Sequence, residues 1–378
     1  DYIRYKLDTG SPTNLSSIAG SNYRIATGTL DAGSSVSYTL YVWIREGVGN
    51  DVLNKHYHGK IVVEGENVTR EENAPELDSG MIAVTYNGSR WVKADSNSKD
   101  WYDYSEQRWA NAVTVTSASR STYQSAEVGT EINMDDIETM WVWIPRYSYT
   151  IGSEDGTNYY GKQGEFLDTT PTQALPGEID IKFVDTNTKD RGTAKYIVNN
   201  GIEDNSWYTP DAFTFGDQEL SGIWVGKFET SSSDPSAPSG GGNTTSLDAM
   251  IKPNVTSWRN INVSNAFAVT QKMNDNGNRY GLTTNADTHM MKNSEWAIVA
   301  YLSQSRYGKL GNTNFTGANK EIYQNKSNQY ITGCSYGAPS NGNTDYGCQY
   351  QYNLDINGTG ASTTGNIYAI YDMSGGAW

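Results

Sequence analysis

Four short tryptophan-bearing blocks, set between long polar stretches, constrain the fold of this chain more than any other feature. They lie at residues 140–145, 222–230, 289–300 and 365–378. Aromatic residues make up 12% of the chain, which is too many for a disordered protein. By contrast, residues 308–365 are almost entirely Gly, Asn, Thr, Tyr and Gln. Long irregular loops are uncommon unless ions, disulfides or side-chain hydrogen bonds pin them, and they often carry binding function. We therefore expect a loop-dominated globular body.

The last block has the most specific pattern. Residues 365–378, GNIYAIYDMSGGAW, resemble the signature segment of the formylglycine-generating-enzyme-like family, which usually reads G-L-Y-D-M-x-G-N-V-W-E-W. The other three blocks are similar to that family's opening strand, its next strand and a helix, in that order: residues 140–145, 222–230 and 289–300. The resemblance covers roughly residues 138–378. It implies a sulfatase-modifying-factor fold of the C-type-lectin type.

The resemblance implies that residues 79–378 form one loop-rich domain with two short helices. Capping signals favour helices that begin at Ser264 and Asn293, the second with Trp296 facing inward. Residues 231–245, SSSDPSAPSGGGNTT, are of low complexity and predict a flexible surface insert.

Residues 1–66 predict a separate β-sandwich module. Residues 35–44 alternate between apolar and polar side chains, as a half-buried strand does, and residues 60–65 form a short strand closed by glycine. This part resembles β-sandwich modules of Gram-positive surface and matrix-fibre proteins. The acidic residues 67–78, which include a proline, predict a linker. The overall expectation is an α+β fold, with a small β-sandwich before the C-type-lectin-like domain.

The charge balance excludes one class of partner. The chain has 28 Lys and Arg against 43 Asp and Glu, a formal net charge of −15. A negative surface repels the phosphate backbone, whose attraction supplies most non-specific nucleic-acid affinity, so nucleic-acid binding is not expected. No stretch approaches the roughly eighteen apolar residues of a membrane span, and no secretory signal is visible. Because the chain starts in a strand-like segment and stops within the last block, we expect a piece of a longer protein.

The two cysteines, Cys334 and Cys348, lie close together in a loop rich in Tyr, Gly and Asn. An even pair at this spacing in a secreted protein predicts a disulfide, which would contribute about 3 kcal/mol by restricting the unfolded chain. The alternative is two reduced thiols. The catalytic cysteines of the resembled family follow its W-E-W segment, so neither cysteine corresponds to them, and a copper-dependent oxidase activity is not expected.

Tyrosines interleaved with Asn and Gln crowd the same loop-rich region. Rigid rings beside adaptable amides are typical of binding surfaces, and they could stack on sugars while the amides bind hydroxyls. The alternative is that the rings fill a core or a subunit interface. The candidate ligand-binding residues are Tyr323, Tyr330, Tyr336, Tyr346, Tyr350 and Tyr352.

Calcium is the metal that these loops would favour, because it prefers carboxylate, amide and carbonyl oxygens. The resemblance implies a calcium site near the G-N-V-W-E-W turn, and its candidate ligands here are Asn366 and Asp372. Gly376 stands where the family has its Asn.

These observations predict a non-catalytic extracellular protein of a Gram-positive bacterium, displayed on the cell surface or on an appendage. Its lectin-like domain would bind a host or surface glycan or protein, as an adhesin or a pilus or fibre subunit does. One alternative is a purely structural subunit that repeats in an extracellular filament and contacts like subunits. The other is a formylglycine-generating oxidase whose cysteines lie beyond Trp378.

Overall fold

The chain divides into two compact units, Asp1–Thr69 and Arg70–Trp378, and the division falls inside the predicted linker 67–78. Strands outnumber helices, and the four α-helices among the described residues are all short, so the chain is of the mixed α+β class. The computed structural model describes residues 2–21, 25–26, 37–53, 74–151, 179–192, 194, 196–199, 202–205, 207–339 and 347–377.

The first unit contains one antiparallel sheet in the order β2-β1-β3. Its strands are β1 (Ile3–Leu7), β2 (Thr13–Asn14) and β3 (Leu40–Ile44). Half or more of the surface of several apolar side chains on and beside β3 is exposed, so the described residues leave this sheet largely uncovered. The strand predicted at residues 60–65 lies outside the described part of the chain.

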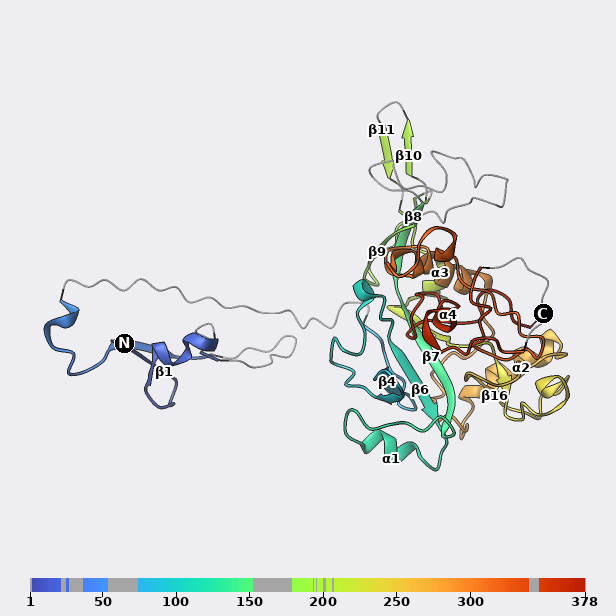
Figure 1. Cartoon of the computed structure of the whole chain (residues 1–378), viewed down its shortest axis with the longest axis horizontal. Helices are drawn as coiled ribbons and strands as arrows, with labels where there is room; N and C mark the ends of the chain where they lie inside the picture. Colours follow the sequence, from blue (N-terminus) through green and yellow to red (C-terminus); the bar gives the residue numbers. More distant parts are fainter. Residues whose placement is uncertain are drawn as a thin grey trace. The chain divides into compact units, whose positions relative to one another are not determined.

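A five-stranded antiparallel sheet organises the second unit, in the order β14-β7-β6-β4-β5 (Figure 1). The strands are β4 (Ile82–Tyr86), β5 (Trp91–Lys93), β6 (Asn111–Val115), β7 (Ile137–Pro145) and β14 (Gly222–Gly226). Every residue of β6 is buried, as are eight of the nine in β7. Both faces of the sheet are therefore covered, which explains why β7 is an almost continuous apolar run rather than an alternating one.

The remaining strands form two-stranded antiparallel sheets: β8 (Tyr147–Ile151) with β9 (Ile179–Phe183), β10 (Tyr196–Asn199) with β11 (Ile202–Asn205), β12 (Thr214–Phe215) with β13 (Gln218–Glu219), and β15 (Ser231–Ser232) with β16 (Ala249–Met250). The α-helices are α1 (Arg120–Ser125), α2 (Val263–Gln271), α3 (Asn293–Ser303) and α4 (Asp355–Thr359). Most of the second half of the chain is therefore loop.

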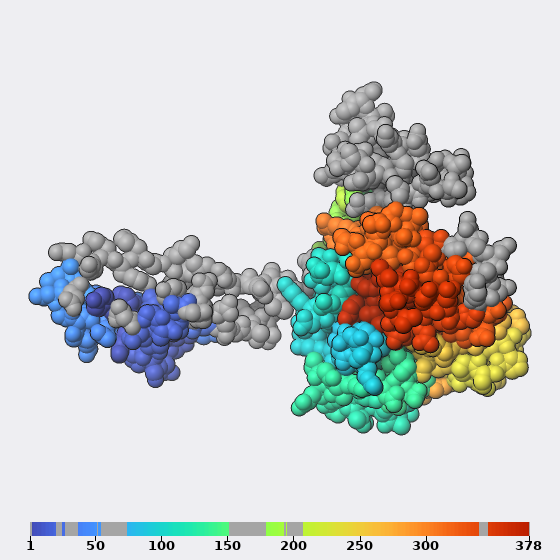
Figure 2. Space-filling model, viewed as in Figure 1, coloured from blue at the N-terminus to red at the C-terminus, as the bar shows by residue number. Residues whose placement is uncertain are grey.

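The four tryptophan-bearing blocks meet in one core. Trp143 of β7, Val225 of β14, Ile298 of α3 and Ile370 near the end of the chain belong to a single cluster of buried side chains. Figure 2 shows residues from the last part of the chain, orange to red, lying beside cyan residues from the start of this unit. Blocks that are far apart in sequence thus stabilise each other directly.

Two fully buried lysines attach the loops to this core. Lys227 Nζ donates hydrogen bonds to the carbonyl oxygens of Ile367 (2.7 Å) and Ala369 (2.8 Å). Lys309 Nζ donates to the carbonyl oxygens of Glu321 and Gly360. Burial lowers the pKa of Lys227 well below its usual value and lowers the pKa of Lys309 to about 7.

The start of α3 differs from the expectation. Asn293 is the first helical residue rather than the cap, and the Glu295 carboxylate reaches back to accept from the backbone N–H of Lys292 at 2.7 Å. Trp296 is 48% exposed instead of facing inward. Ile298 and the other buried apolar residues of α3 face the core instead. They lie three, four and seven residues after Glu295, which places them on the same face of the helix as Glu295.

Residues 231–245 were expected to form a flexible insert but contain regular structure. Ser231 belongs to β15, and its hydroxyl donates to the carbonyl oxygen of Thr256 at 2.6 Å. The indole N–H of Trp258 donates to the Gly242 carbonyl at 2.7 Å. Small residues permit this packing, because a Cβ on Gly241 would lie only 2.6 Å from the Trp258 indole nitrogen.

The buried Lys309 predicts an unusual pH dependence. Its folded-state pKa of about 7 lies below the usual 10.5, so the folded state releases a proton that the unfolded chain keeps between these values. Stability should therefore rise from pH 7 to pH 10, by at most about 1.4 kcal/mol per pH unit for one lysine. We expect Lys309→Met to make this rise shallower in urea unfolding followed by tryptophan fluorescence, whereas the exposed Lys99→Met should not. Parallel profiles for the two variants would contradict the prediction.

Candidate ligand-binding surface

A disulfide joins Cys334 and Cys348, as the sequence predicted, with their Cα atoms 5.3 Å apart. It reinforces a short antiparallel bridge in which Ser335 and Tyr350 exchange backbone hydrogen bonds of 2.8 and 3.1 Å. The ring of Tyr350 packs on Gly337, where an added Cβ would lie 2.6 Å from the ring. The disulfide therefore holds two loop segments at a defined spacing.

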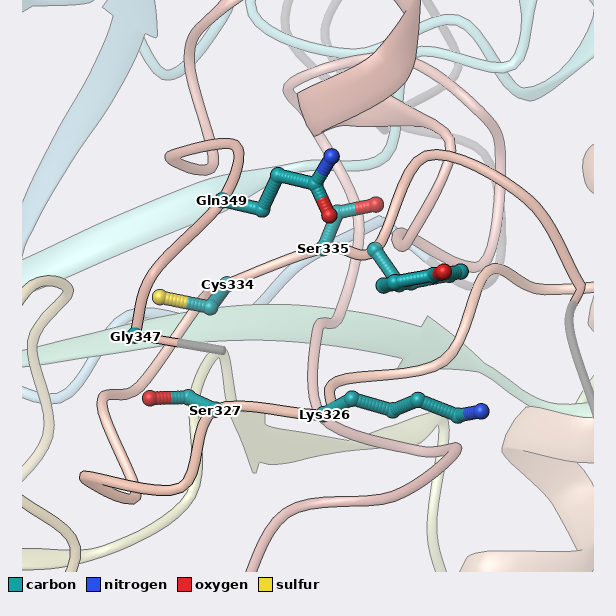
Figure 3. Close-up of a pocket in the computed structure, with 7 residues that line it drawn as sticks. Lys326, Ser327, Cys334, Ser335, Gly347 and Gln349 are labelled. Atoms are coloured by element: carbon teal, nitrogen blue, oxygen red, sulfur yellow. The ribbon is translucent and has the colours of Figure 1, made fainter. Parts of the chain in front are cut away.

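A shallow hollow of about 150 Å³, including its open side, lies beside this disulfide. Ser335 and Gln349 lie on one side of it, and Lys326 and Ser327 on the other (Figure 3). The hollow is too shallow to enclose even a water molecule, so a ligand would rest on the surface around it, where the Gln349 amide is exposed. Its lining residues are Lys326, Ser327, Cys334, Ser335, Tyr336, Gly347 and Gln349.

The carboxylate of Asp372, a partly buried residue, joins the loop that carries this surface to other segments of the unit. Asp372 accepts hydrogen bonds from the Asn325 amide at 2.8 Å, from the backbone N–H of Gly333 at 2.9 and 3.0 Å, and from that of Glu229 at 3.1 Å. Burial raises the pKa of Asp372, while these donors lower it. One carboxylate thus connects the last block, the segment that follows β14 and the loop that carries the hollow.

Glu229 lies next to Asp372 and holds the end of the described chain. Its carboxylate accepts from the Ser257 hydroxyl at 2.7 Å and from the Ala377 backbone N–H at 3.0 Å. Burial raises its pKa to about 6. Gly376 has a φ of +90°, and a Cβ there would lie 2.8 Å from the Glu229 carboxylate. This close approach gives a physical reason for glycine at a position where the resembled family has Asn.

The two predicted calcium ligands are engaged by the protein itself. The Asn366 side-chain oxygen accepts from the Thr364 hydroxyl at 2.8 Å and the Tyr368 backbone N–H at 2.9 Å, and its amide donates to the Gln107 carbonyl at 2.9 Å. Asp372 already accepts from the donors described above. Within the described residues, no cluster of three or more His, Cys, Asp or Glu could hold a metal. Asn366 and Asp372 as arranged here do not fit a calcium site.

The predicted tyrosines divide between the core and the surface. Tyr323 and Tyr352 are buried, and the Tyr352 hydroxyl accepts from the Trp91 indole at 3.2 Å. These two rings fill the core, which was the alternative interpretation of the cluster. Tyr330, Tyr336 and Tyr350 are half-buried and can contact a ligand. Tyr346 lies outside the described part of the chain.

Two of the half-buried tyrosines carry a cation on one face. The Lys326 ammonium lies 5.1 Å from the centre of the Tyr336 ring, and the Arg259 guanidinium carbon lies 3.8 Å from the centre of the Tyr330 ring. A turn between Ser327 and Tyr330 connects the two pairs. In this turn the Tyr330 N–H donates to the Ser327 carbonyl at 2.9 Å. Sequence reasoning missed Arg259, because no motif or spacing relates it to Tyr330.

This arrangement places aromatic and hydrogen-bonding groups side by side. Aromatic rings supply contact area, and cations and amides supply directional hydrogen bonds. The sequence has two cysteines, and the disulfide occupies both, so neither is available as a thiol nucleophile.

Comparisons of the chain with protein-family models, with curated proteins and with solved structures find no match. None of the helices in the described ranges is both long and apolar enough to cross a bilayer.

The disulfide should stabilise the second unit. It closes a loop between residues 14 apart in sequence, which restricts the unfolded chain by about 3 kcal/mol. We expect the double substitution Cys334→Ala and Cys348→Ala to lower the free energy of unfolding in urea by about that amount. Reductant should weaken the unsubstituted protein similarly and leave the double variant unchanged. Equal stability with and without the bridge would contradict the prediction.

Proposed function

We propose that this chain is a non-catalytic extracellular protein of a bacterial surface or appendage, and that its second unit is a lectin-like domain that binds glycans. The site is the hollow beside the disulfide together with the half-buried tyrosines Tyr330, Tyr336 and Tyr350. The wider class is that of adhesins and of pilus or fibre subunits.

Three features support the proposal. The four blocks that resemble the formylglycine-generating-enzyme-like family pack together in one core, as that family's fold requires. A disulfide persists mainly in oxidising, extracytoplasmic environments, which favours an extracellular location. The loop surface combines polar groups with accessible rings. Of these, the rigidly supported surface with its two cation–tyrosine pairs carries the proposal.

A glycan array tests the binding function. We expect the labelled chain to bind a subset of glycans and the double substitution Tyr336→Ala and Gln349→Ala to weaken binding about tenfold or more, because ring stacking and an amide contact disappear together. Tyr38→Ala, at an exposed tyrosine of the first unit, is the matched control and should bind normally. Absence of binding on the array, or equal binding by the double variant, would refute the proposal.

A second candidate function is a structural filament subunit. β3 is an edge strand among the described residues, and Tyr41, Val42 and Ile44 on it are about half exposed. An exposed apolar edge strand is a template for pairing with another chain. The predicted outcome is self-association: sedimentation velocity should show oligomers that Val42→Lys dissolves, whereas Val128→Lys, at an exposed valine of the second unit, should leave them intact. A monomer at all concentrations would count against this function.

A further inference from the structure

Arg259 has an unusual environment for an arginine. Its backbone N–H donates to the Ser239 carbonyl at 2.8 Å, and its guanidinium stacks on the Tyr330 ring. The Nε atom is buried without a hydrogen-bond partner. Among the described residues, the guanidinium donates no hydrogen bond and forms no ion pair within 4.0 Å. The N–H groups on its two Nη atoms therefore have no partner among the described residues.

The other arginines described in the second unit each donate to a carboxylate, a carbonyl or a hydroxyl. Arg146, for example, pairs with Glu219 at 2.8 Å, and Arg120 donates to the Val115 carbonyl at 3.2 Å. The acidic side chain that interacts electrostatically with Arg259 is Glu229, but its carboxylate is bound by the hydroxyl and backbone donors described above. Arg259 is thus left for a partner outside these residues.

The backbone around Arg259 is held in a defined conformation. The Ser257 N–H donates to the Tyr330 carbonyl at 2.8 Å, and the Asn260 amide donates to the Ser239 hydroxyl at 2.8 Å. Ser239, Asn260 and Tyr330 all have positive φ, near +60°. Such conformations are costly for residues other than glycine and concentrate at functional sites. Stacking and these hydrogen bonds preorganise the guanidinium, so that little freedom is lost when it binds.

A planar guanidinium fork matches the two oxygens of a carboxylate. Exposed amides flank the pair, Asn260 beside Arg259 and Asn328 and Gln329 before Tyr330, and they suit the hydroxyl groups of a sugar. We propose that Arg259, stacked on Tyr330, anchors the carboxylate of an acidic sugar. This inference rests on the proposed glycan-binding function and deepens it, since it names the class of glycan.

Two pairs of probes test the anchor: trigalacturonate with its methyl ester, and sialyllactose with lactose, each titrated into the full chain by calorimetry. We expect one acid to bind about tenfold more tightly than its neutral partner, because only the acid accepts both N–H donors of the fork. Arg259→Gln should remove this preference, so that the variant binds the acid and its neutral partner with equal affinity. Arg259→Lys should retain only part of it, since an ammonium keeps the charge without the fork. Arg90→Gln, at an exposed surface arginine, is the control.

The comparison of acid with neutral sugar needs no variant, so the inference stays testable if Arg259→Gln unfolds. Equal affinity for acid and neutral partner in both pairs overturns the anchor, while binding that still depends on Tyr336 leaves the proposed function standing. Absence of binding by all four sugars overturns the anchor, while binding to other glycans on the array leaves the proposed function standing. If a poly-glutamate peptide binds through Arg259 and neither acidic sugar does, the assignment to a glycan is overturned.

Discussion

The attachment of the final block to the central sheet is the constraint on which the rest of the second unit depends. Lys227, directly after β14, supplies its backbone carbonyl to the Tyr371 N–H at 2.8 Å and its side chain to two carbonyls of the same block. The Phe228 ring stacks on that of Tyr371 at 5.2 Å. Buried backbone groups need partners, and this block has little regular structure to provide them. The buried lysine donates the hydrogen bonds that a neighbouring strand would donate in a sheet.

Two other ionisable side chains also attach loops to the core through hydrogen bonds to the backbone. Asp372 binds three chain segments through N–H donors, and Lys309 joins two others through carbonyl oxygens. A buried charge is costly by itself, and hydrogen bonds to the charged group offset that cost. Loops held in this way can carry a preorganised surface without strands or helices beneath it. Gly333, which donates to Asp372, directly precedes Cys334 of the candidate binding surface, so this carboxylate helps to fix the position of that loop.

Local patterns in the sequence predicted several elements correctly. The β7 and β14 blocks form neighbouring strands, the block at residues 289–300 contains most of α3, and the cysteine pair is bridged. Where the expectation differed, tertiary contacts were the cause. Trp296 faces outward because the core selects the face of α3 that carries Ile298. The serine-rich segment 231–245 is packed because its glycines let the backbone approach Trp258 closely.

The sequence by itself determined the class of the chain, the position of its main strands and the pairing of its only two cysteines. These follow from short-range patterns and from counting, which need no knowledge of the path of the loops. Only the tertiary structure decided which tyrosines are buried, that Asp372 accepts hydrogen bonds from the loop at Gly333, and that Arg259 meets Tyr330. Each of these depends on contacts between segments far apart in the chain, and side-chain hydrogen bonds within long loops leave no periodic trace in a sequence.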